Sequence, residues 1–481
     1  MLFNSYVFIF CFLPVTLAVF FLITKFGSKK IAKIWLTLAS IFFYGYWNIA
    51  YVPLLLLSVV ANYYLGKIIN EVKPGSKQAK ALLWLGIGGN LGLIIYYKYA
   101  GFFTASANSL LNINFLIPEV VLPLGISFYT FTQIAYLVDC YRGETKNYDF
   151  LTYFLFITFY PQLIAGPLLL HSELIPQLEE SKTFRLSYKN LVQGLAWFCL
   201  GLAKKLLFAD SVSALVGPVF EHASEVSFFE AWLGALSYTL QLYFDFSGYS
   251  DMAIGLALMV NIHLPINFNS PYKATSIVDF WRRWHITLSR FLRDYLYIPL
   301  GGNRLGETRR YFNLMVTMLL GGLWHGAGWT FVIWGGLHGA FLVINHKWQK
   351  LGISIPAIFA WAITFASVVV GWVFFRASSI QDATQILLAM LGMKQVLIPS
   401  SYQHLFQGIS IPGVQFVDDL PYWRDPKAVV ALLLCALLLP NTQQLMKHFK
   451  PNLWWAIAIS CVATLSLFSM NRISEFLYFQ F

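Results

Sequence analysis

The chain has 481 residues, of which 58% are hydrophobic, 18% aromatic and only 11% charged, and its formal net charge is +11. Soluble domains carry about a quarter charged residues, so this composition excludes an ordinary soluble protein and indicates an integral membrane protein. The lysines and arginines gather in short loops between apolar runs, and no basic face with stacking aromatics lies outside these runs. We therefore expect a lipid bilayer as partner, and no nucleic acid.

The N-terminal apolar run and the cysteines give further information on the class of protein. The first apolar run has no charged segment before it, is nearly long enough to cross a bilayer, and is followed by Lys25, Lys29 and Lys30. This pattern is typical of a retained first helix with its N-terminus outside, not of a cleaved signal peptide. The five cysteines form no C-x-x-C pair, so we expect neither a disulfide framework nor a metal site.

Apolar runs separated by short polar links follow one another along the rest of the chain. Several are shorter than the roughly 20 residues of a straight span, so we expect tilted and re-entrant helices among them. The basic loops 25–33 and 67–80 are predicted to lie in the cytoplasm. The candidate spans are Tyr6–Thr24, Ile34–Trp47, Val52–Gly66, Ala81–Tyr97, Val121–Val138, Phe150–Leu170, Leu191–Phe208, Phe228–Phe244, Phe312–Ile344, Pro356–Phe374, Ala428–Leu439 and Leu453–Phe468.

These runs predict an all-α, polytopic integral membrane protein of about ten to twelve transmembrane helices, with interfacial and re-entrant helices that together form a tunnel. We expect a single integral-membrane domain over residues 1–481. No internal repeat is visible in the sequence, so a transporter built from inverted repeats gains no support.

Two acidic residues stand at the end of an apolar helix in the segment FDFSGYSD (Phe244–Asp251). Asp245 and Asp251 are candidates for substrate binding or for acid catalysis. A structural role, in which each carboxylate braces a helix end or pairs with a nearby cation, is favoured for buried carboxylates of this kind.

A Pro/Asn-rich loop, Asn261–Tyr272, leads into a basic amphipathic segment. Ser276 and Asp279 form an S-x-x-D capping box, which predicts the start of a helix. We expect that helix to run to about Tyr297, shortly before Pro299 and the glycines that follow it.

His285 lies on this predicted helix, one turn after Trp281. At that spacing it points towards protein or lipid, whereas Arg283, Arg290 and Arg293 lie off the apolar face, as is typical of a helix at the cytoplasmic interface. The spacing alone does not distinguish a functional histidine from a structural one.

The loop GGNRLGETRR (Gly301–Arg310) comes close to a phosphate-binding P-loop, but Glu307 occupies the lysine position and no strand precedes the loop. This excludes a nucleotide-hydrolysing site. Arg304 and Arg309 remain candidates for binding the phosphates of an anionic donor. Binding of anionic lipid headgroups explains their charge equally well.

A polar, glycine-rich patch interrupts the next apolar run, GGLWHGAGWTFVIWGGLH (Gly321–His338). An ionisable residue within a membrane segment is a functional-site candidate, which points to His325 and makes its neighbour Trp324 a candidate substrate contact. The glycines suit close helix packing, but beside a buried histidine they favour a tunnel. The spacings of His338 and His346 do not match a metal-binding helix, and we expect His338 to be packed and hydrogen-bonded.

The order of the segments FDFSGYSD, NFNSPY, DFWRRWHITLSRFLRDYLYIPLGGNR and GGLWHGAGWTFVIWGGLHG resembles the membrane-bound O-acyltransferase superfamily. Within it, the chain is most similar to the membrane subunits of bacterial alginate O-acetyltransferases. LPLGISFYTFTQIAYLVDCYRG (Leu122–Gly143), PQLIAGP (Pro161–Pro167) and FLYFQF (Phe476–Phe481) fit the same group. The family core is predicted at about residues 122–346.

The resemblance implies that His325 is the essential histidine and that His285 is its partner. Acyl transfer needs a base for the hydroxyl proton and a donor for the oxyanion, and a buried His325 is expected to be neutral and basic. It further implies a multi-pass protein of the bacterial inner membrane with no bound cofactor. The acetyl donor would be a cytoplasmic thioester, most simply acetyl-CoA, and a periplasmic partner would complete transfer to a polysaccharide. D-alanyl transfer to a cell-wall polymer, and a transporter, stand as alternatives.

Overall fold

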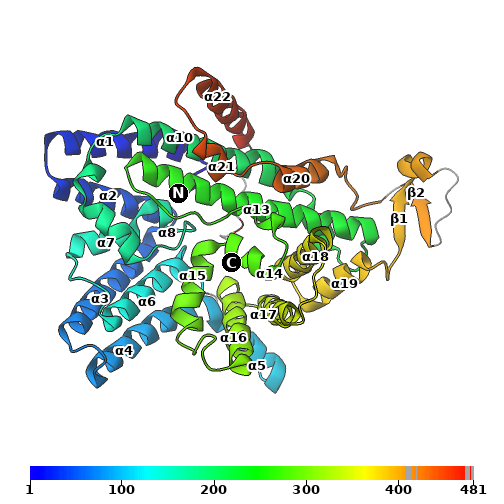
Figure 1. The fold of residues 1–481 in the computed structure, drawn as a ribbon, viewed down its shortest axis with the longest axis horizontal. Coiled ribbons are helices and arrows are strands. Elements are labelled where there is room, and N and C mark those ends of the chain that lie inside the picture. The colour runs from blue at the N-terminus through cyan, green and yellow to red at the C-terminus, as the bar shows by residue number, and fades with distance from the viewer. Residues whose placement is uncertain (119, 407–412, 419, 472–476, 478–481) are drawn as a thin grey trace. The chain divides into compact units, whose positions relative to one another are not determined.

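The computed structural model describes residues 1–118, 120–406, 413–418, 420–471 and 477, and within them the protein is almost entirely helical (Figure 1). These residues divide into two compact units. Unit 1 comprises residues 1–202, 248–267 and 444–471, and unit 2 comprises residues 203–247, 268–443 and Leu477. The predicted helical class is confirmed, and the single domain over the whole chain stays a prediction.

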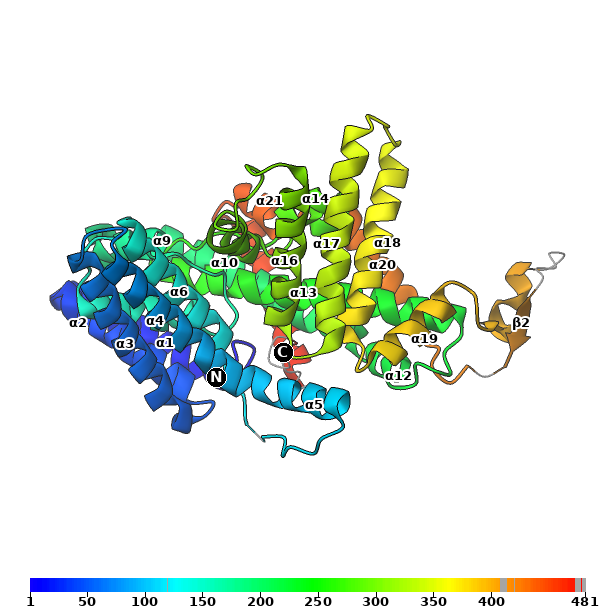
Figure 2. The same ribbon diagram turned by 90° about the horizontal axis from the view of Figure 1, so that it is seen from below.

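Most helices of unit 1 coincide with the predicted apolar runs, but α5 and α9 lie outside them. The predicted span Phe150–Leu170 is wrong as one helix, because it is interrupted at Phe159 and its helical part ends at Leu163. In both views α3, α4 and α6 lie side by side (Figures 1 and 2). The helices are α1 (Leu13–Phe26), α2 (Lys29–Gly45), α3 (Val52–Glu71), α4 (Lys77–Ile94), α5 (Ala100–Leu111), α6 (Ile126–Arg142), α7 (Phe150–Thr158), α8 (Tyr160–Leu163), α9 (His171–Glu179), α10 (Tyr188–Ala203) and α22 (Leu453–Phe468).

Unit 2 contains the histidine-bearing segments and the described strands, β1 (Val396–Pro399) and β2 (Val414–Val417), which pair in parallel. Its helices α16, α17 and α18 lie side by side in both views (Figures 1 and 2). The helices are α11 (Asp210–Ser213), α12 (Val216–Glu221), α14 (Ile277–Arg283), α15 (Ile286–Leu292), α16 (Glu307–His325), α17 (Trp329–Lys350), α18 (Ala357–Arg376), α19 (Ile380–Met390) and α20 (Lys427–Leu438).

Three helices cross the boundary between the units along the chain, and α10 does so only with its last residue, Ala203. The long α13 (Phe228–Met259) belongs to unit 2 up to Ser247 and to unit 1 from Gly248 onwards, and α21 (Thr442–Lys447) passes from unit 2 to unit 1.

Five of the described helical segments are long and apolar enough to cross a membrane. Together with the apolar composition they make this a multi-pass membrane protein. The predicted total of about ten to twelve spans stays a prediction, because the other predicted spans form shorter or more polar helices. The five segments are Phe8–Phe26, Ile49–Glu71, Lys77–Leu111, Tyr188–Ser213 and Ala357–Arg376.

Glycine pairs bring α10 and the unit 1 part of α13 into backbone contact. A Cβ atom on Gly201 would lie 2.5 Å from the carbonyl oxygen of Gly248, and one on Gly194 would lie 2.6 Å from that of Gly255. Any larger side chain would push the two helices apart, so these glycines fix the interhelical distance, as small residues do in membrane helix pairs.

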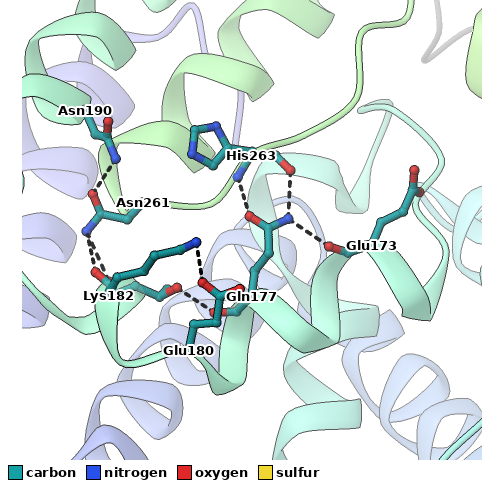
Figure 3. A network of polar contacts seen from close by, with 8 residues as sticks. Glu173, Gln177, Glu180, Lys182, Asn190, Asn261 and His263 are labelled. Atoms are coloured by element: carbon teal, nitrogen blue, oxygen red, sulfur yellow. Dashed lines mark hydrogen bonds and ion pairs between the residues drawn. The ribbon is translucent and has the colours of Figure 1, made fainter.

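The loop that follows α13 is fixed in unit 1 by side-chain amides (Figure 3). Asn261 has a positive φ of 62°, donates to the carbonyl oxygen of Thr183 at 3.2 Å, and accepts from the amide of Asn190 at 2.9 Å. Gln177 on α9 bonds both the backbone N–H and the carbonyl of His263, at 2.8 and 3.0 Å. The predicted Pro/Asn-rich loop is confirmed, and its first residues are held rigidly.

Substituting Gly201 with alanine tests the glycine contact. The new methyl group would overlap the Gly248 carbonyl oxygen, so we expect a loss of about 1–3 kcal/mol in stability, which is the usual cost of overpacking. The midpoint of thermal unfolding of the purified protein in detergent measures this loss.

Gly88→Ala on α4 is the matched control, because a Cβ atom there meets nothing within 4 Å. That change should leave the midpoint unchanged or raise it slightly, since alanine is the better helix former. Equal midpoints for the two variants would contradict the role given to Gly201.

Candidate active site

His285 and His325 lie together in unit 2. His325 is the last residue of α16, His285 immediately precedes α15, and their ring centroids are 6.4 Å apart. His285 is 0% exposed and His325 is 6% exposed. The prediction that the two histidines share one site is consistent with this placement, and a small reacting group would contact both rings.

The segment around His285 differs from the predicted continuous helix. The capping box is confirmed, because the Ser276 hydroxyl accepts from the Asp279 N–H at 3.1 Å. However, α14 ends at Arg283, and His285 adopts the left-handed conformation with φ 42° and ψ 55° before α15 begins. This conformation is uncommon for a residue other than glycine. The single helix predicted to Tyr297 is therefore wrong, because the chain turns at the histidine.

Arg283 stabilises this turn from the side. Its Nε donates to Oδ1 of Asp279 at 2.9 Å, and its carbonyl oxygen accepts from the N–H of Asn269 at 2.9 Å. Its Nη1 lies 3.4 Å from the Asn269 carbonyl oxygen. These bonds join the end of α14 to the loop before it, so Arg283 is occupied in structural contacts and does not line the cavity described below.

Aromatic rings enclose both imidazoles. The ring of His325 lies 4.9 Å from Trp324 and 5.0 Å from Trp334 between centroids, and the ring of His285 lies 4.8 Å from Phe246 and 6.1 Å from Trp324. Trp324 therefore contacts both histidines. Such apolar surroundings strengthen any hydrogen bond formed inside the site.

The glycines beside His325 serve helix packing. A Cβ atom on Gly322 would lie 2.3 Å from the carbonyl oxygen of Phe331, and one on Gly335 would lie 2.3 Å from that of Met318. The backbones of α16 and α17 thus touch at these positions. The prediction that these glycines line a tunnel is wrong for Gly322 and Gly335, because no space remains between the helices for a substrate.

A cavity of about 570 Å³ lies instead among α14, α15, the π-helical turn Arg293–Tyr297, α16 and α17. Arg282 and Arg290 contribute positive charge to its lining, Arg293 lies there in an ion pair with Asp294, and His346 lies there as well. The Nη2 atom of Arg310 lies 2.9 Å from Nδ1 of His346. Arginine is well suited to phosphate, and this lining would accept an anionic ligand.

The sequence singled out Arg290 and Arg293 but missed Arg282 and His346 as neighbours of one cavity. His346 lies beyond the apolar run that ends at Ile344. Burial, and then the positive charges of Arg310 and Arg282, lower the pKa of His346. Arg282 lies eight residues before Arg290, and this spacing could have indicated it, but no local signal relates His346 on α17 to that segment.

The remaining candidate residues lie elsewhere. Arg304 and Arg309 are exposed and do not line the cavity, and Arg309 stacks on Phe312 at 5.2 Å. Asp245 is buried 2.6 Å from the ammonium of Lys205 and accepts from the N–H of Leu477, which suits a structural role. Their assignment to substrate binding stays a prediction.

Asp251, the other predicted carboxylate, is buried within α13 in unit 1. His338 is 0% exposed, so the expectation that it is packed is correct, but the expectation that it is hydrogen-bonded is wrong, because neither ring nitrogen has a partner among the described residues. No group of three or more histidine, cysteine or acidic side chains suited to a metal ion occurs in the described part of the chain. Of the terminal motif Phe476–Phe481, all but Leu477 lies outside the described residues.

Several known proteins are similar to this chain. Over 517 aligned residues it is 40% identical to a peptidoglycan O-acetyltransferase of Helicobacter pylori, with 100% of this chain and 98% of that protein covered. Over 401 residues it is 42% identical to the protein named Probable alginate O-acetylase AlgI of Pseudomonas aeruginosa, with 82% and 75% covered. A teichoic acid D-alanyltransferase of Streptococcus thermophilus is 28% identical over 248 residues, with 47% and 57% covered.

The model of the MBOAT, membrane-bound O-acyltransferase, family matches residues 41–380. This match includes both histidines and extends on either side of the core expected from the motifs. Together with the apolar helices and the buried histidine pair, this match shows that the chain is a membrane-bound acyltransferase. The chain belongs to the membrane-bound O-acyltransferase family.

Proposed function

We propose that the protein is an O-acetyltransferase that moves an acetyl group from a cytoplasmic thioester to a hydroxyl of a polysaccharide outside the cytoplasm. The observation that carries the proposal is the pairing of two buried histidines at 6.4 Å between ring centroids, in a chain of this family. Acyl transfer to a hydroxyl needs a base and an oxyanion donor, and two imidazoles provide both.

In the proposed step His325 accepts the proton of the attacking hydroxyl while the hydroxyl oxygen forms a bond to the acetyl carbonyl carbon. His285 donates a hydrogen bond to the oxygen that becomes negative. The carbon–sulfur bond then breaks, and the departing thiolate takes the proton from His325. Because aromatic rings exclude water around both imidazoles, the hydrogen bond to the oxyanion is stronger than it would be in water.

The arginine-lined cavity supports a donor that carries phosphate, and acetyl-CoA is the simplest thioester of this kind. Arg282 and Arg290 provide guanidinium groups, and one guanidinium can bind two phosphate oxygens at once, whereas Nε and Nη2 of Arg293 donate to the Asp294 carboxylate at 2.6 and 3.0 Å. Arg304 and Arg309 remain proposed contacts of the same donor outside the cavity. Their exposure equally fits binding of anionic lipid headgroups.

The comparisons favour peptidoglycan over alginate as the acceptor. The similarity to the peptidoglycan O-acetyltransferase covers the whole of this chain, whereas the similarity to the alginate O-acetylase covers 82% of it. D-alanyl transfer is the second candidate, but the matching enzyme is only 28% identical and covers 47% of this chain. We further propose that the protein lies in the bacterial inner membrane and that a periplasmic partner completes the transfer to the polysaccharide.

His325→Ala should reduce acetyl transfer at least about 100-fold while the protein still inserts and accumulates normally, because general base catalysis contributes about 10²–10⁴-fold. The assay is transfer of labelled acetyl from acetyl-CoA by membranes that contain equal amounts of each variant. His222→Ala is the control, since His222 is exposed, bonds the Pro218 carbonyl and stacks on Tyr422, away from both histidines of the site. Activity of His325→Ala above about a tenth of wild type would rule out the base.

Arg290→Gln should raise the KM for acetyl-CoA several-fold and change kcat much less, because the lost contact binds the ground state and the transition state alike. Steady-state kinetics with purified protein measure both constants. The double variant Arg304→Gln/Arg309→Gln is measured in the same way, so that the effect of the exposed loop on the KM can be compared with that of the cavity. An unchanged KM in Arg290→Gln would contradict the donor site in the cavity.

The loop 301–310 is predicted to lie in the cytoplasm, because Arg304, Arg309 and Arg310 obey the positive-inside bias. A cysteine at position 308, introduced as Thr308→Cys in a variant without the native cysteines, should resist impermeant thiol reagents in intact cells and react after permeabilisation. Rapid labelling of intact cells would place the donor cavity on the opposite side of the membrane.

A further inference from the structure

The two described strands form an uncovered sheet in unit 2. β1 and β2 pair in parallel, with Val396 opposite Val414 and Pro399 opposite Val417. In both views the pair lies beyond α19 and apart from the helices of unit 2 (Figures 1 and 2). Among the strand residues only Ile398 is buried. Parallel strands are normally covered on both faces, and two strands without such cover are at best marginally stable in water, so this sheet needs a further element.

The outer edge of β1 is open to such an element. Val396, Leu397 and Ile398 form no backbone hydrogen bond with a described residue outside the pairing with β2. The strands have the sequences VLIP and VQFV, and neither contains a charged residue. Proteins normally protect an exposed edge with charged side chains, a bulge or a covering segment. An uncharged open edge is suited to pairing with another strand.

The chain on either side of the sheet is fixed to the end of α12 and the start of α13. Before β1, Nζ of Lys394 donates to the carbonyl oxygens of Ala223 and Ser224 at 3.1 and 3.0 Å. After β2, the N–H of Tyr422 donates to Oε1 of the buried Glu230 at 3.0 Å. These bonds hold the strands in place from both ends although their own faces are not buried. The fold therefore presents the sheet in a defined position.

The path of the chain places the sheet on the side of the membrane opposite the loop 301–310. α16 begins just after this loop, and Nη2 of Arg310 lies 2.9 Å from Nδ1 of His346 near the end of α17, so α17 returns to the same side. α18 is then a candidate span of 20 residues. Its length of about 30 Å matches the hydrocarbon thickness of a bilayer. With the loop in the cytoplasm, α19 and the sheet lie outside the cytoplasm.

A protein strand suits the open edge better than lipid does. Hydrocarbon satisfies no backbone N–H or C=O group, and open sheet edges do not occur within it. A strand added from another protein satisfies these groups and places every second side chain against the surface beside it. The proposed function needs such a protein on this side of the membrane, because a periplasmic partner completes the transfer to the polysaccharide.

We propose that the outer edge of β1 is the docking site for this periplasmic partner, which adds an extended, uncharged strand to the sheet. The inference rests on the proposed function, since it assumes the partner and the cytoplasmic position of the loop 301–310. The sheet lies outside residues 41–380, which match the family model. Docking is thus separate from the chemistry at the two histidines.

Leu397→Lys tests the edge, because a charged side chain on an edge strand opposes strand pairing. O-acetylation of the polysaccharide in cells that contain equal amounts of each variant should fall about threefold to tenfold, the worth of one hydrogen bond. Consumption of acetyl-CoA by the purified full-length protein with a small hydroxyl acceptor should not change, because the histidines are untouched.

Leu391→Lys is the matched control. It makes the same substitution at an exposed leucine that lies between α19 and β1, outside the strands. This variant should retain wild-type O-acetylation. Normal O-acetylation in Leu397→Lys, equal losses in the two variants, or a parallel loss of acetyl-CoA consumption in Leu397→Lys would each overturn the docking edge.

Photocrosslinking in cells tests the contact directly and does not depend on how Leu397→Lys folds. A photoreactive p-benzoylphenylalanine in place of Val396 should crosslink to one extracytoplasmic protein, identified by mass spectrometry. Deletion of that protein should abolish O-acetylation of the polysaccharide and leave acetyl-CoA consumption intact. Crosslinks only to a second copy of this chain, or only to lipid, overturn the proposal. A wild type that consumes no acetyl-CoA overturns the proposed donor, whereas the crosslink still tests the docking edge.

Discussion

The left-handed conformation of His285 is the constraint on which the candidate site depends. A non-glycine residue in this region costs about 1–3 kcal/mol, and such strain persists only where the surrounding structure enforces it. Here the bonds of Arg283 to Asp279 and Asn269 hold the chain on the N-terminal side of the turn. On the other side, the carbonyl oxygen of His285 accepts the first bond of α15, from the N–H of Ser289 at 3.0 Å. The fold thus stabilises a conformation that exposes the imidazole to His325.

The same short segment also forms part of the wall of the arginine-lined cavity. Arg282 stands at the end of α14 and Arg290 on α15, so guanidinium groups that suit phosphate lie on either side of the histidine that suits an oxyanion. The close contact of α16 and α17 at Gly322 and Gly335 fixes the other histidine. Two tight backbone arrangements, rather than a wide glycine-lined tunnel, therefore position the two histidines. Preorganised donors in an apolar site are the largest source of catalysis in acyl transfer.

Much of this site could be predicted from the sequence. An ionisable residue within an apolar run is costly, which pointed to His325, and the ordered motifs pointed to His285. The capping box at Ser276 was predictable as well, because it depends on neighbouring residues alone. The predictions that were wrong concerned features that depend on contacts between residues distant in sequence. The helix break at His285 has no local proline or glycine to signal it, and the amphipathic spacing continues through it.

The roles of the glycines and of the carboxylates could not be predicted either, because they too depend on contacts between residues distant in sequence. Glycine in a membrane segment is compatible with both a tunnel and a helix contact, and only the position of the opposing carbonyl oxygen distinguishes them. Asp245 was equally ambiguous until Lys205, forty residues earlier in the sequence, was found 2.6 Å from its carboxylate. The cavity lining was predicted only in part, because Arg282 and His346 meet through the packing of α14 against α17.

The central claim is that His285 and His325 act as one site, and a double-mutant cycle on acetyl transfer tests it most directly. The rates of wild type, His285→Ala, His325→Ala and the double variant are compared at equal protein levels. Residues that act as a unit are strongly non-additive, so the double variant should be no slower than about the more damaged single variant. A double variant whose loss equals the product of the two single losses would show that the histidines act independently and would contradict the shared site.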